Sequence, residues 1–197
     1  MADGGRVIAG SARSIRLDAP GPATRPLGDR VKQTLFAVLD RDLPGSRFLD
    51  LFAGSGAGGI EALSRGAARA AFVERDATAA RVIMANLART HLGDPQRVSV
   101  VRQDVLGWLR DPARDGEPPW DVVLVDPPYG AGPLLGDALR AVDRLVAPGG
   151  RVVAKHFWRD VPAERVGLLA SERARRFGET ALTFYRREAV DTTTEDA

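Results

Sequence analysis

The sequence contains no cysteine, and its 197 residues include only two histidines and two methionines. Without cysteine the chain can form neither a disulfide nor a thiolate metal site, which excludes a stapled secreted scaffold and fits the cytoplasm. The acids and histidines show no metal-ligand spacing, so no metal is expected. No apolar run approaches the roughly 20 residues that span a bilayer, and the first residues lack a signal-peptide core, so no membrane partner is expected either.

The chain also carries little net charge, because 28 basic residues nearly balance 26 acidic residues. An apolar fraction of 44% and a charged fraction of 27% are typical of a globular chain of one domain. Six basic and two acidic residues lie between Arg6 and Lys32, whereas the charged residues after Arg187 are all acidic. A basic N-terminal arm suits a phosphate backbone, but charge alone favours a plain solvated surface in an arginine-rich protein.

Short apolar segments alternate with helical patterns along most of the chain. Strand patterns occupy residues 48–52, 70–74, 98–101, 120–125, 151–154, 173–177 and 181–187, and half-alternating segments at 6–9 and 14–17 predict an N-terminal hairpin. Helical patterns occupy residues 29–43, 58–65, 77–91, 105–109 and 134–145. This alternation predicts an α/β fold, a doubly wound and mostly parallel sheet with an antiparallel C-terminal strand pair. We divide the chain into a basic hairpin and helix appendage (1–45), a main domain (46–187) and a disordered acidic tail (188–197).

The quartet Asp126-Pro127-Pro128-Tyr129 follows the apolar run 120–125, which is typical of a buried parallel strand. Open α/β sheets bind their ligands at the carboxyl ends of strands, where these four residues would lie. A carboxylate and a proline carbonyl can each accept an N–H from an exocyclic amine on a flat ring, and a tyrosine can stack on that ring. We therefore predict that Asp126, Pro127 and Tyr129 are catalytic and that Pro128 and Tyr129 contact the substrate. The competing interpretation is a structural turn, because Asp-Pro pairs start turns readily.

A glycine-rich loop follows the first strand of the main domain. Gly54, Gly56 and Gly59 satisfy the G-x-G-x-x-G pattern, in which glycines permit a tight turn and a close approach of the backbone to a ligand. Glu74 ends the next strand about 20 residues later, where an acid can accept hydrogen bonds from ribose hydroxyls. A nicotinamide dinucleotide and S-adenosylmethionine fit these features equally well, and a tight turn without a ligand has the same spacing.

Two further acids favour S-adenosylmethionine as the cofactor. Asp50 directly precedes the glycines, where a carboxylate would repel a pyrophosphate but attract the cationic amino-acid portion of S-adenosylmethionine. Asp104 follows the third strand, where it can accept the adenine amino group, although an Asp there is also a good helix N-cap. The predicted cofactor site comprises Asp50, Phe52, Gly54, Gly56, Glu74, Arg75, Asp104 and Val105.

In their order along the chain, these motifs resemble the class I S-adenosylmethionine-dependent methyltransferases that modify amino groups. Over roughly residues 6 to 187, the chain resembles the RsmD family of bacterial methyltransferases. The segments that carry the closer resemblance are Arg6-Val7-Ile8-Ala9-Gly10, Thr24-Arg25-Pro26, Asp29-Arg30-Val31-Lys32, Leu49 to Gly56 and Gly59 to Ala67. The resemblance implies methylation of a guanine N2 in 16S ribosomal RNA, free or within an assembling 30S subunit. It favours also the interpretation that Arg25, Arg30 and Lys32 contact the RNA, to which the alternative is surface salt bridges, partly with Asp29. We expect a cytoplasmic monomer.

The chain departs from the family pattern at several places outside the quartet. Leu27-Gly28 stands where Thr or Ser is usual, Gly58 replaces a bulky apolar residue, and Ser14-Ile15 replaces a Gly-Arg pair. Lys155-His156 ends the fifth strand, where an acid is often found. These departures leave the RNA target open.

Other functions share part of the pattern. A DNA methyltransferase acting on adenine N6 or cytosine N4 shares the quartet, but such enzymes usually need an added target-recognition region. A release-factor glutamine methyltransferase more often carries Asn in place of Asp126. A nicotinamide-dependent oxidoreductase fits the glycine loop but leaves the quartet without a role. A non-catalytic RNA-binding assembly factor would bind RNA without turnover.

Overall fold

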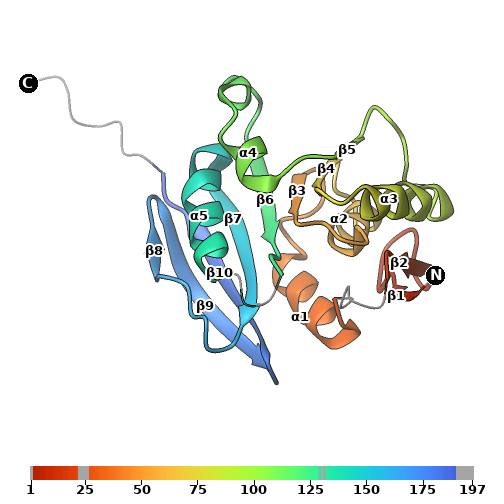
Figure 1. The fold of residues 1–197 in the computed structure, drawn as a ribbon, viewed down its shortest axis with the longest axis horizontal. Coiled ribbons are helices and arrows are strands. Elements are labelled where there is room, and N and C mark those ends of the chain that lie inside the picture. Colours follow the sequence, from red (N-terminus) through yellow and green to blue (C-terminus); the bar gives the residue numbers. More distant parts are fainter. Residues whose placement is uncertain (1, 22–26, 129, 131, 190–197) are drawn as a thin grey trace, which may run out of the picture.

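The computed structural model describes residues 2–21, 27–128, 130 and 132–189 (Figure 1). Its strands are β1 (Ala2–Arg6), β2 (Arg16–Ala19), β3 (Arg47–Leu51), β4 (Arg69–Val73), β5 (Val98–Val101), β6 (Trp120–Val125), β7 (Val146–Phe157), β8 (Arg165–Val166), β9 (Leu169–Phe177) and β10 (Thr180–Arg187). Its α-helices are α1 (Asp29–Leu39), α2 (Ala57–Ser64), α3 (Ala77–Arg89), α4 (Val105–Leu109) and α5 (Gly132–Val142), with 3-10 turns at Pro112–Arg114 and Asp143–Leu145.

Eight strands form one sheet in the order β5-β4-β3-β6-β7-β10-β9-β8. The first five strands are parallel, β10 is antiparallel to β7, and β9 is antiparallel to β10. The chain moves outward from β3 to β5 and then returns to place β6 on the other side of β3 (Figure 1). Doubly wound sheets bind ligands at such a reversal, outside the carboxyl ends of the strands. The strand order therefore directs attention to the ends of β3 and β6.

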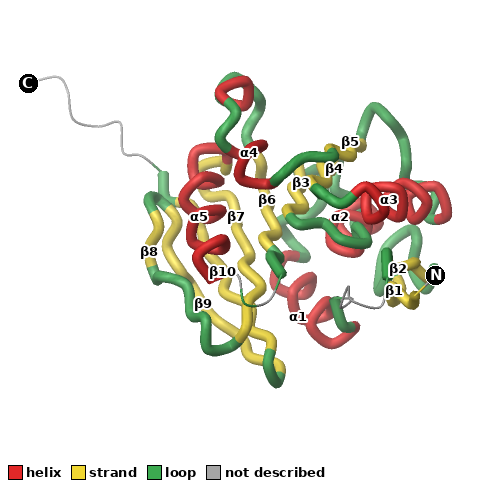
Figure 2. Tube along the Cα trace, viewed as in Figure 1, coloured by secondary structure: helices red, strands yellow, loops and turns green. Residues whose placement is uncertain are grey.

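Each face of the sheet has its own apolar core, because successive side chains of a strand point to opposite faces. Phe48 and Leu124 pack on one face with residues of α1, α2 and α3. Leu49 and Val123 pack on the other face with α4 and α5. Figure 2 shows helices on both sides of the strands. The predicted α/β fold, with a mostly parallel sheet and an antiparallel end, is confirmed.

The N-terminal hairpin is docked on α2 through a buried acid. The carboxylate of Glu61 accepts hydrogen bonds from the backbone N–H groups of Ile8 (2.7 Å) and Ala9 (3.0 Å). The hydroxyl of Ser64 donates to the carbonyl of Ala9. Gly10 lies so close to α2 that an added Cβ would be 1.8 Å from the Ser64 carbonyl oxygen. Two separate segments of the sequence pattern, 6–10 and 59–67, thus form a single interface.

Several predicted boundaries differ from the structure. The hairpin strands are displaced from the predicted segments: β1 overlaps 6–9 only at Arg6, and β2 overlaps 14–17 only at Arg16 and Leu17. The displacement arises because residues between Arg6 and Arg16 form the loop that docks on α2. Helix α1 ends four residues before the predicted residue 43, and the short β8 was not predicted. Strand β7 extends beyond 151–154 at both ends, because residues 151–157 pair with β10 and Val146 pairs with Trp120 of β6.

Glu188, the first residue of the predicted disordered tail, lies within the described part of the chain and is held in place. It binds Arg165 through two hydrogen bonds of 2.6 and 2.8 Å. Its backbone N–H also donates to the carbonyl of Leu168. Residues 190–197 lie outside the described part of the chain, and the division after residue 45 stays a prediction.

Candidate active site

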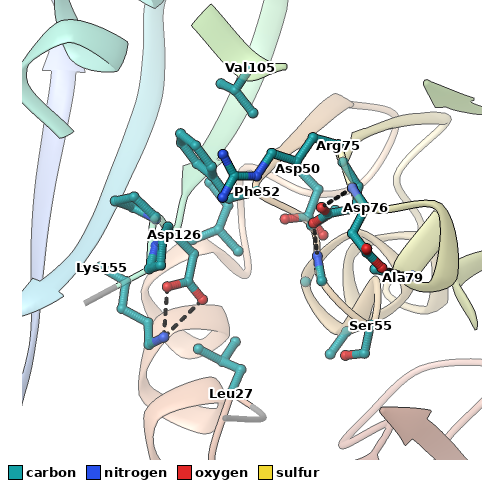
Figure 3. Close-up of a pocket in the computed structure, with 18 of the residues that line it drawn as sticks. Leu27, Asp50, Phe52, Ser55, Arg75, Asp76, Ala79, Val105, Asp126 and Lys155 are labelled. Carbon is teal, nitrogen blue, oxygen red and sulfur yellow. Dashed lines mark hydrogen bonds and ion pairs between the residues drawn. The ribbon is translucent and has the colours of Figure 1, made fainter. Parts of the chain in front are cut away.

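A cavity of about 490 Å³ opens at the carboxyl ends of β3 and β6. Figure 3 shows Asp50 and Asp126 reaching toward it from these two strands, with Leu27 approaching from a third side. Pro20 also lines the cavity, so the segment between the hairpin and α1 contributes to its wall. The volume lies within the range of ordinary cofactor and small-molecule sites.

The glycine loop between β3 and α2 has a backbone that few other residues could adopt. Gly54 and Gly56 have φ angles of 54° and 76°, which glycine reaches without steric cost. Phe52, which lines the cavity, has φ of 60°, an uncommon value for a bulky residue. At Gly58 an added Cβ would lie 2.6 Å from a leucine side chain on β6 and 3.0 Å from the Asp50 carboxylate. The loop therefore holds its backbone directly against the cavity.

Asp50 is buried beside the amino end of α2. Its Oδ2 accepts a hydrogen bond of 2.7 Å from the Gly59 N–H, and only 2% of the residue is exposed. Burial raises the pKa of Asp50 to about 8; the Gly59 N–H opposes this shift, and the negative charges of Asp126 and Glu74 add to it. The carboxyl group is therefore mostly protonated at neutral pH, and a cation entering the cavity would favour its ionised form.

Glu74 and Asp104 both accept hydrogen bonds from backbone N–H groups and both line the cavity. Glu74 binds the N–H groups of Gly54 (2.9 Å) and Asp76 (2.8 Å). Asp104 is the N-cap of α4 and binds the N–H of Gly107 at 3.0 Å. The capping interpretation of Asp104 is thus correct, and its position at the cavity leaves the cofactor interpretation open as well. The other predicted cofactor residues that line the cavity are Phe52, Gly54, Arg75 and Val105.

Gly56 does not line the cavity. It caps α2, and an added Cβ there would lie 3.1 Å from a side-chain carbon of Ile83. Its contribution is therefore to the turn and to the packing of α2 against α3, and the predicted direct contact with the cofactor has no support from its position.

Asp126 forms an ion pair that the sequence analysis missed. The Nζ of Lys155 lies 2.6 and 2.9 Å from the two carboxylate oxygens of Asp126, and the two side chains are 9% and 22% exposed (Figure 3). Burial raises the pKa of Asp126, and the ammonium of Lys155 opposes that effect. The parallel register explains the contact, since Val125 pairs with Ala154 and the next residue of each strand faces the cavity. Only knowledge of that register could have predicted it.

His156, the neighbour of Lys155, has a structural role. Its Nδ1 lies 2.8 Å from the carbonyl oxygen of Phe157, and its Nε2 lies 2.9 Å from the hydroxyl of Thr183. Burial lowers the pKa of His156, so the ring is neutral at physiological pH.

The residues predicted to contact RNA differ in their exposure to solvent. Lys32 is completely buried, its ammonium donates to the carbonyl of Arg6, and burial lowers its pKa. The prediction that Lys32 contacts RNA is therefore wrong, because this side chain fastens the N-terminal segment to α1. Arg30 is exposed on the first turn of α1 and remains available. Arg25 and Tyr129 lie outside the described residues.

The remaining features of the site concern prolines, metals and membranes. Pro127 is buried and Pro128 is exposed, and both line the cavity. Among the described residues, no group of three or more acids and histidines is arranged to hold a metal ion. In that same part of the chain, no helix is both long enough and apolar enough to cross a bilayer.

The chain is similar to known methyltransferases in sequence and in fold. The family model described as "Conserved hypothetical protein 95" matches residues 5–186. YlbH of Bacillus subtilis (strain 168), which is provisionally named an rRNA methyltransferase, is 36% identical over 92% of this chain and 98% of its own length. Ribosomal RNA small subunit methyltransferase D of Haemophilus influenzae is 42% identical over 125 residues, 63% of each chain. Among solved structures, yhhF of Escherichia coli, provisionally named a methyltransferase, superposes with a TM-score of 0.79 at 32% identity, over 94% of this chain and 98% of that one.

Proposed function

The chain belongs to the "Conserved hypothetical protein 95" family, the RsmD family of rRNA methyltransferases, and we propose that it methylates the exocyclic N2 of a guanine in 16S ribosomal RNA with S-adenosylmethionine as the methyl donor. Methyl transfer to ribosomal RNA follows from family membership, whereas the choice of base and atom is the proposal. The observation that supports it most is one cavity with two unlike carboxyl groups at adjacent strand ends, Asp50 and Asp126.

The residues on the β3–β4–β5 side of the cavity fit S-adenosylmethionine. Bound there, S-adenosylmethionine supplies an electrophilic methyl group carried on a positively charged sulfur. Asp50 suits the ammonium of its amino-acid portion, because within the described residues only Oδ2 is engaged and Oδ1 is left for a ligand. Glu74 suits the ribose hydroxyls and Asp104 the adenine amine, since carboxylates accept hydrogen bonds from both groups. We propose that the cofactor contacts are Asp50, Phe52, Gly54, Glu74, Arg75, Asp104 and Val105.

Asp126 is the proposed hydrogen-bond acceptor for an N–H of the reacting amine. The amine of guanine is a poor nucleophile, because its lone pair is delocalised into the ring, and it is too weak a base to need deprotonation before attack. By accepting one N–H, with the Pro127 carbonyl accepting the other, Asp126 would orient the nitrogen toward the methyl group. Both acceptors also complement the positive charge that grows on the nitrogen, and such fixed groups contribute on the order of 3 kcal/mol each. The displaced proton then passes to solvent.

Lys155 acts on this chemistry through Asp126. Its ammonium touches both carboxylate oxygens, which favours the ionised form against the effect of burial and restricts the rotation of the carboxylate. Each oxygen keeps a second lone pair with which to accept an N–H from the substrate. Lys155 is therefore a positioning residue in this mechanism.

The target base must leave its stack to reach the cavity. A paired guanine hides its N2, so the nucleotide is unpaired or flipped when it reacts. Tyr129, next to Pro128, is the proposed stacking partner, and Arg25 and Arg30 are the proposed phosphate contacts near α1. In this scheme residues 46–187 form the catalytic domain and residues 1–45 an RNA-facing appendage. We propose a monomer that acts in the cytoplasm on 16S RNA or on an assembling 30S subunit.

The test is to locate the methyl group. The protein is incubated with labelled S-adenosylmethionine and, in parallel, unmodified 30S subunits, free 16S RNA and duplex DNA, and the labelled nucleoside is then mapped. We expect N2-methylguanosine at one position of 16S RNA in at least one of the two ribosomal substrates. Label in adenine or cytosine of DNA alone would favour a DNA amino methyltransferase, and absence of label from all three would contradict the proposal.

A further inference from the structure

Strand β9 carries an exposed arginine cluster that the mechanism does not use. Arg173, Arg175 and Arg176 occupy three of four consecutive positions, and all three side chains are exposed. At these positions β9 is the edge of the sheet, because β8 pairs only with Leu169 and Ala170. The β9–β10 turn extends at the same end of the sheet as the carboxyl end of β7 (Figure 1).

The strand register places two of these arginines on the face of the sheet that contains the active site. Leu182 of β10 pairs with Lys155 of β7 on one side and with Arg175 of β9 on the other. Directly opposed residues of neighbouring strands point to the same face, so Arg175 shares the face of Lys155 at a distance of roughly 10 Å, two strand spacings. Arg173 lies two residues along β9 and therefore points the same way.

Among the described residues Arg173 and Arg175 have no acidic partner, unlike Arg151 and Arg186 on the neighbouring strands. Arg151 and Arg186 both pair with Glu172, the residue that directly precedes the cluster. Arg176 alternates to the other face, where its guanidinium stacks on Trp158 at 3.7 Å from the ring centroid. Two arginines without an acidic partner in the described part of the chain are thus left on this face, two strands away from Lys155 in the cavity wall.

We propose that Arg173 and Arg175 form a track for the phosphate backbone of the RNA strand that leads into the active site. The inference rests on the proposed RNA substrate and adds a surface to it. Guanidinium groups bind phosphates well, and an uncompensated basic pair about 10 Å from Lys155 lies within reach of a nucleotide next to the target. Arg30, which is exposed on α1 over the same face of the sheet, would be a further contact for the RNA backbone. Charged edge strands also prevent edge-to-edge aggregation, and the test below separates that role from RNA binding.

The experiment compares two charge-matched double variants. Arg173→Gln/Arg175→Gln removes the proposed contacts, whereas Arg41→Gln/Arg69→Gln removes two exposed arginines that precede or begin β3 and β4, away from the carboxyl ends of the strands where the cavity lies. Affinity for transcribed 16S RNA is measured by filter binding between 50 and 200 mM salt, together with affinity for S-adenosylmethionine. Loss of two contacts to single-stranded RNA should lower the salt slope by about 1.4, which corresponds to roughly 25-fold weaker binding near 0.1 M salt.

The expected result is that only the β9 variant loses RNA affinity, with binding of S-adenosylmethionine and methyl transfer at saturating RNA retained. Equal RNA affinity of the two variants would overturn the track, and so would a loss seen with 30S subunits but not with free 16S RNA, which would indicate a protein partner. A wild-type protein that binds RNA at the β9 track but methylates only DNA would contradict the proposed function and leave the track standing. A wild-type protein that does not bind RNA at all would overturn both.

Discussion

The two sides of the active-site cavity hold their carboxyl groups in different ways. On the β3–β4–β5 side, Asp50, Glu74 and Asp104 are bound by backbone N–H groups. On the β6–β7 side, Asp126 is bound by the ammonium of Lys155. A backbone N–H carries no full charge, so burial still raises the pKa of Asp50 to about 8, whereas a lysine directly opposes the same effect at Asp126.

This difference matches two chemical tasks. A carboxyl group that ionises when a cation arrives is suited to recruiting a cationic ligand, because its charge has no counter-ion before binding. A carboxylate whose counter-ion is already in place is suited to receiving a neutral amine and remaining ionised while positive charge develops. The predictions below test whether the two sides are functionally separate.

The largest effect is expected from Asp126→Ala. We expect kcat to fall about 100- to 1,000-fold, the usual effect of removing one fixed group that stabilises a developing charge. Affinity for S-adenosylmethionine, measured by calorimetry, should change little, because the proposed cofactor contacts lie on the other side of the cavity. A comparable loss of cofactor affinity would mean that Asp126 is a binding residue and that the two sides of the cavity do not act separately.

The next effect concerns the pH dependence of methyl transfer in Lys155→Gln. Because Lys155 opposes the rise in the pKa of Asp126, its removal should move the acidic limb of the pH–rate profile to higher pH. Activity at a fixed pH should then fall roughly tenfold for each unit by which the pKa of Asp126 exceeds that pH. Lys155→Arg, which keeps the charge, should restore most of the profile. A uniform loss without a shift in either variant would show that the ion pair is only structural.

On the cofactor side of the cavity, the binding of S-adenosylmethionine should itself depend on pH. Binding of S-adenosylmethionine should tighten as the pH rises toward about 8, by up to about tenfold per unit, because Asp50 must release its proton to meet the ammonium. In Asp50→Asn the affinity should be weaker and independent of pH. Methylthioadenosine, which lacks the amino-acid portion, should show no such dependence with either protein; if it does, the linked group is not Asp50.

The same residue predicts a trend in stability. The pKa of Asp50 is raised in the folded protein above its ordinary value of 3.8, so the folded state holds the proton more tightly than the unfolded chain. Stability contributed by this proton is present at low pH and is lost as the pH rises from about 4 to about 8. Urea unfolding of the ligand-free protein across this range should show the decline in the wild type and a flatter curve in Asp50→Asn.

The smallest effect on catalysis is expected from Glu61→Gln. Glu61 accepts hydrogen bonds from Ile8, Ala9 and Arg65, and an amide group has only one acceptor oxygen. We expect a loss of about 1–3 kcal/mol in unfolding free energy from the unsatisfied donors. The KM for S-adenosylmethionine should rise modestly, because Pro20 and Leu27 continue from the docked hairpin into the cavity wall, while kcat stays unchanged. A large fall in kcat would place the hairpin within the catalytic machinery.

Sequence reasoning succeeded where the signal was local. The alternation of strand and helix patterns predicted the main elements to within a few residues, except in the hairpin and β7. Asp50 and Asp126 were both expected at the cavity, because parallel strands bring their carboxyl ends to one edge of the sheet. The same reasoning failed for Lys32, whose buried ammonium donates a hydrogen bond to the carbonyl of Arg6, 26 residues away in the chain. It also missed Lys155, whose partner is 29 residues away in the chain.

By itself the sequence determined the layered α/β architecture and the position of both acids at the strand ends. Hydrophobic periodicity and the backbone requirements of glycine act over a few residues, and both can be read in order along the chain. Only the tertiary structure decided which charges have partners: Asp126 pairs with Lys155 and Glu61 with the hairpin, whereas Arg173 and Arg175 have no acidic partner within the described ranges. Strand register and burial arise from contacts between distant segments, and those contacts set the charge state on which the proposed chemistry depends.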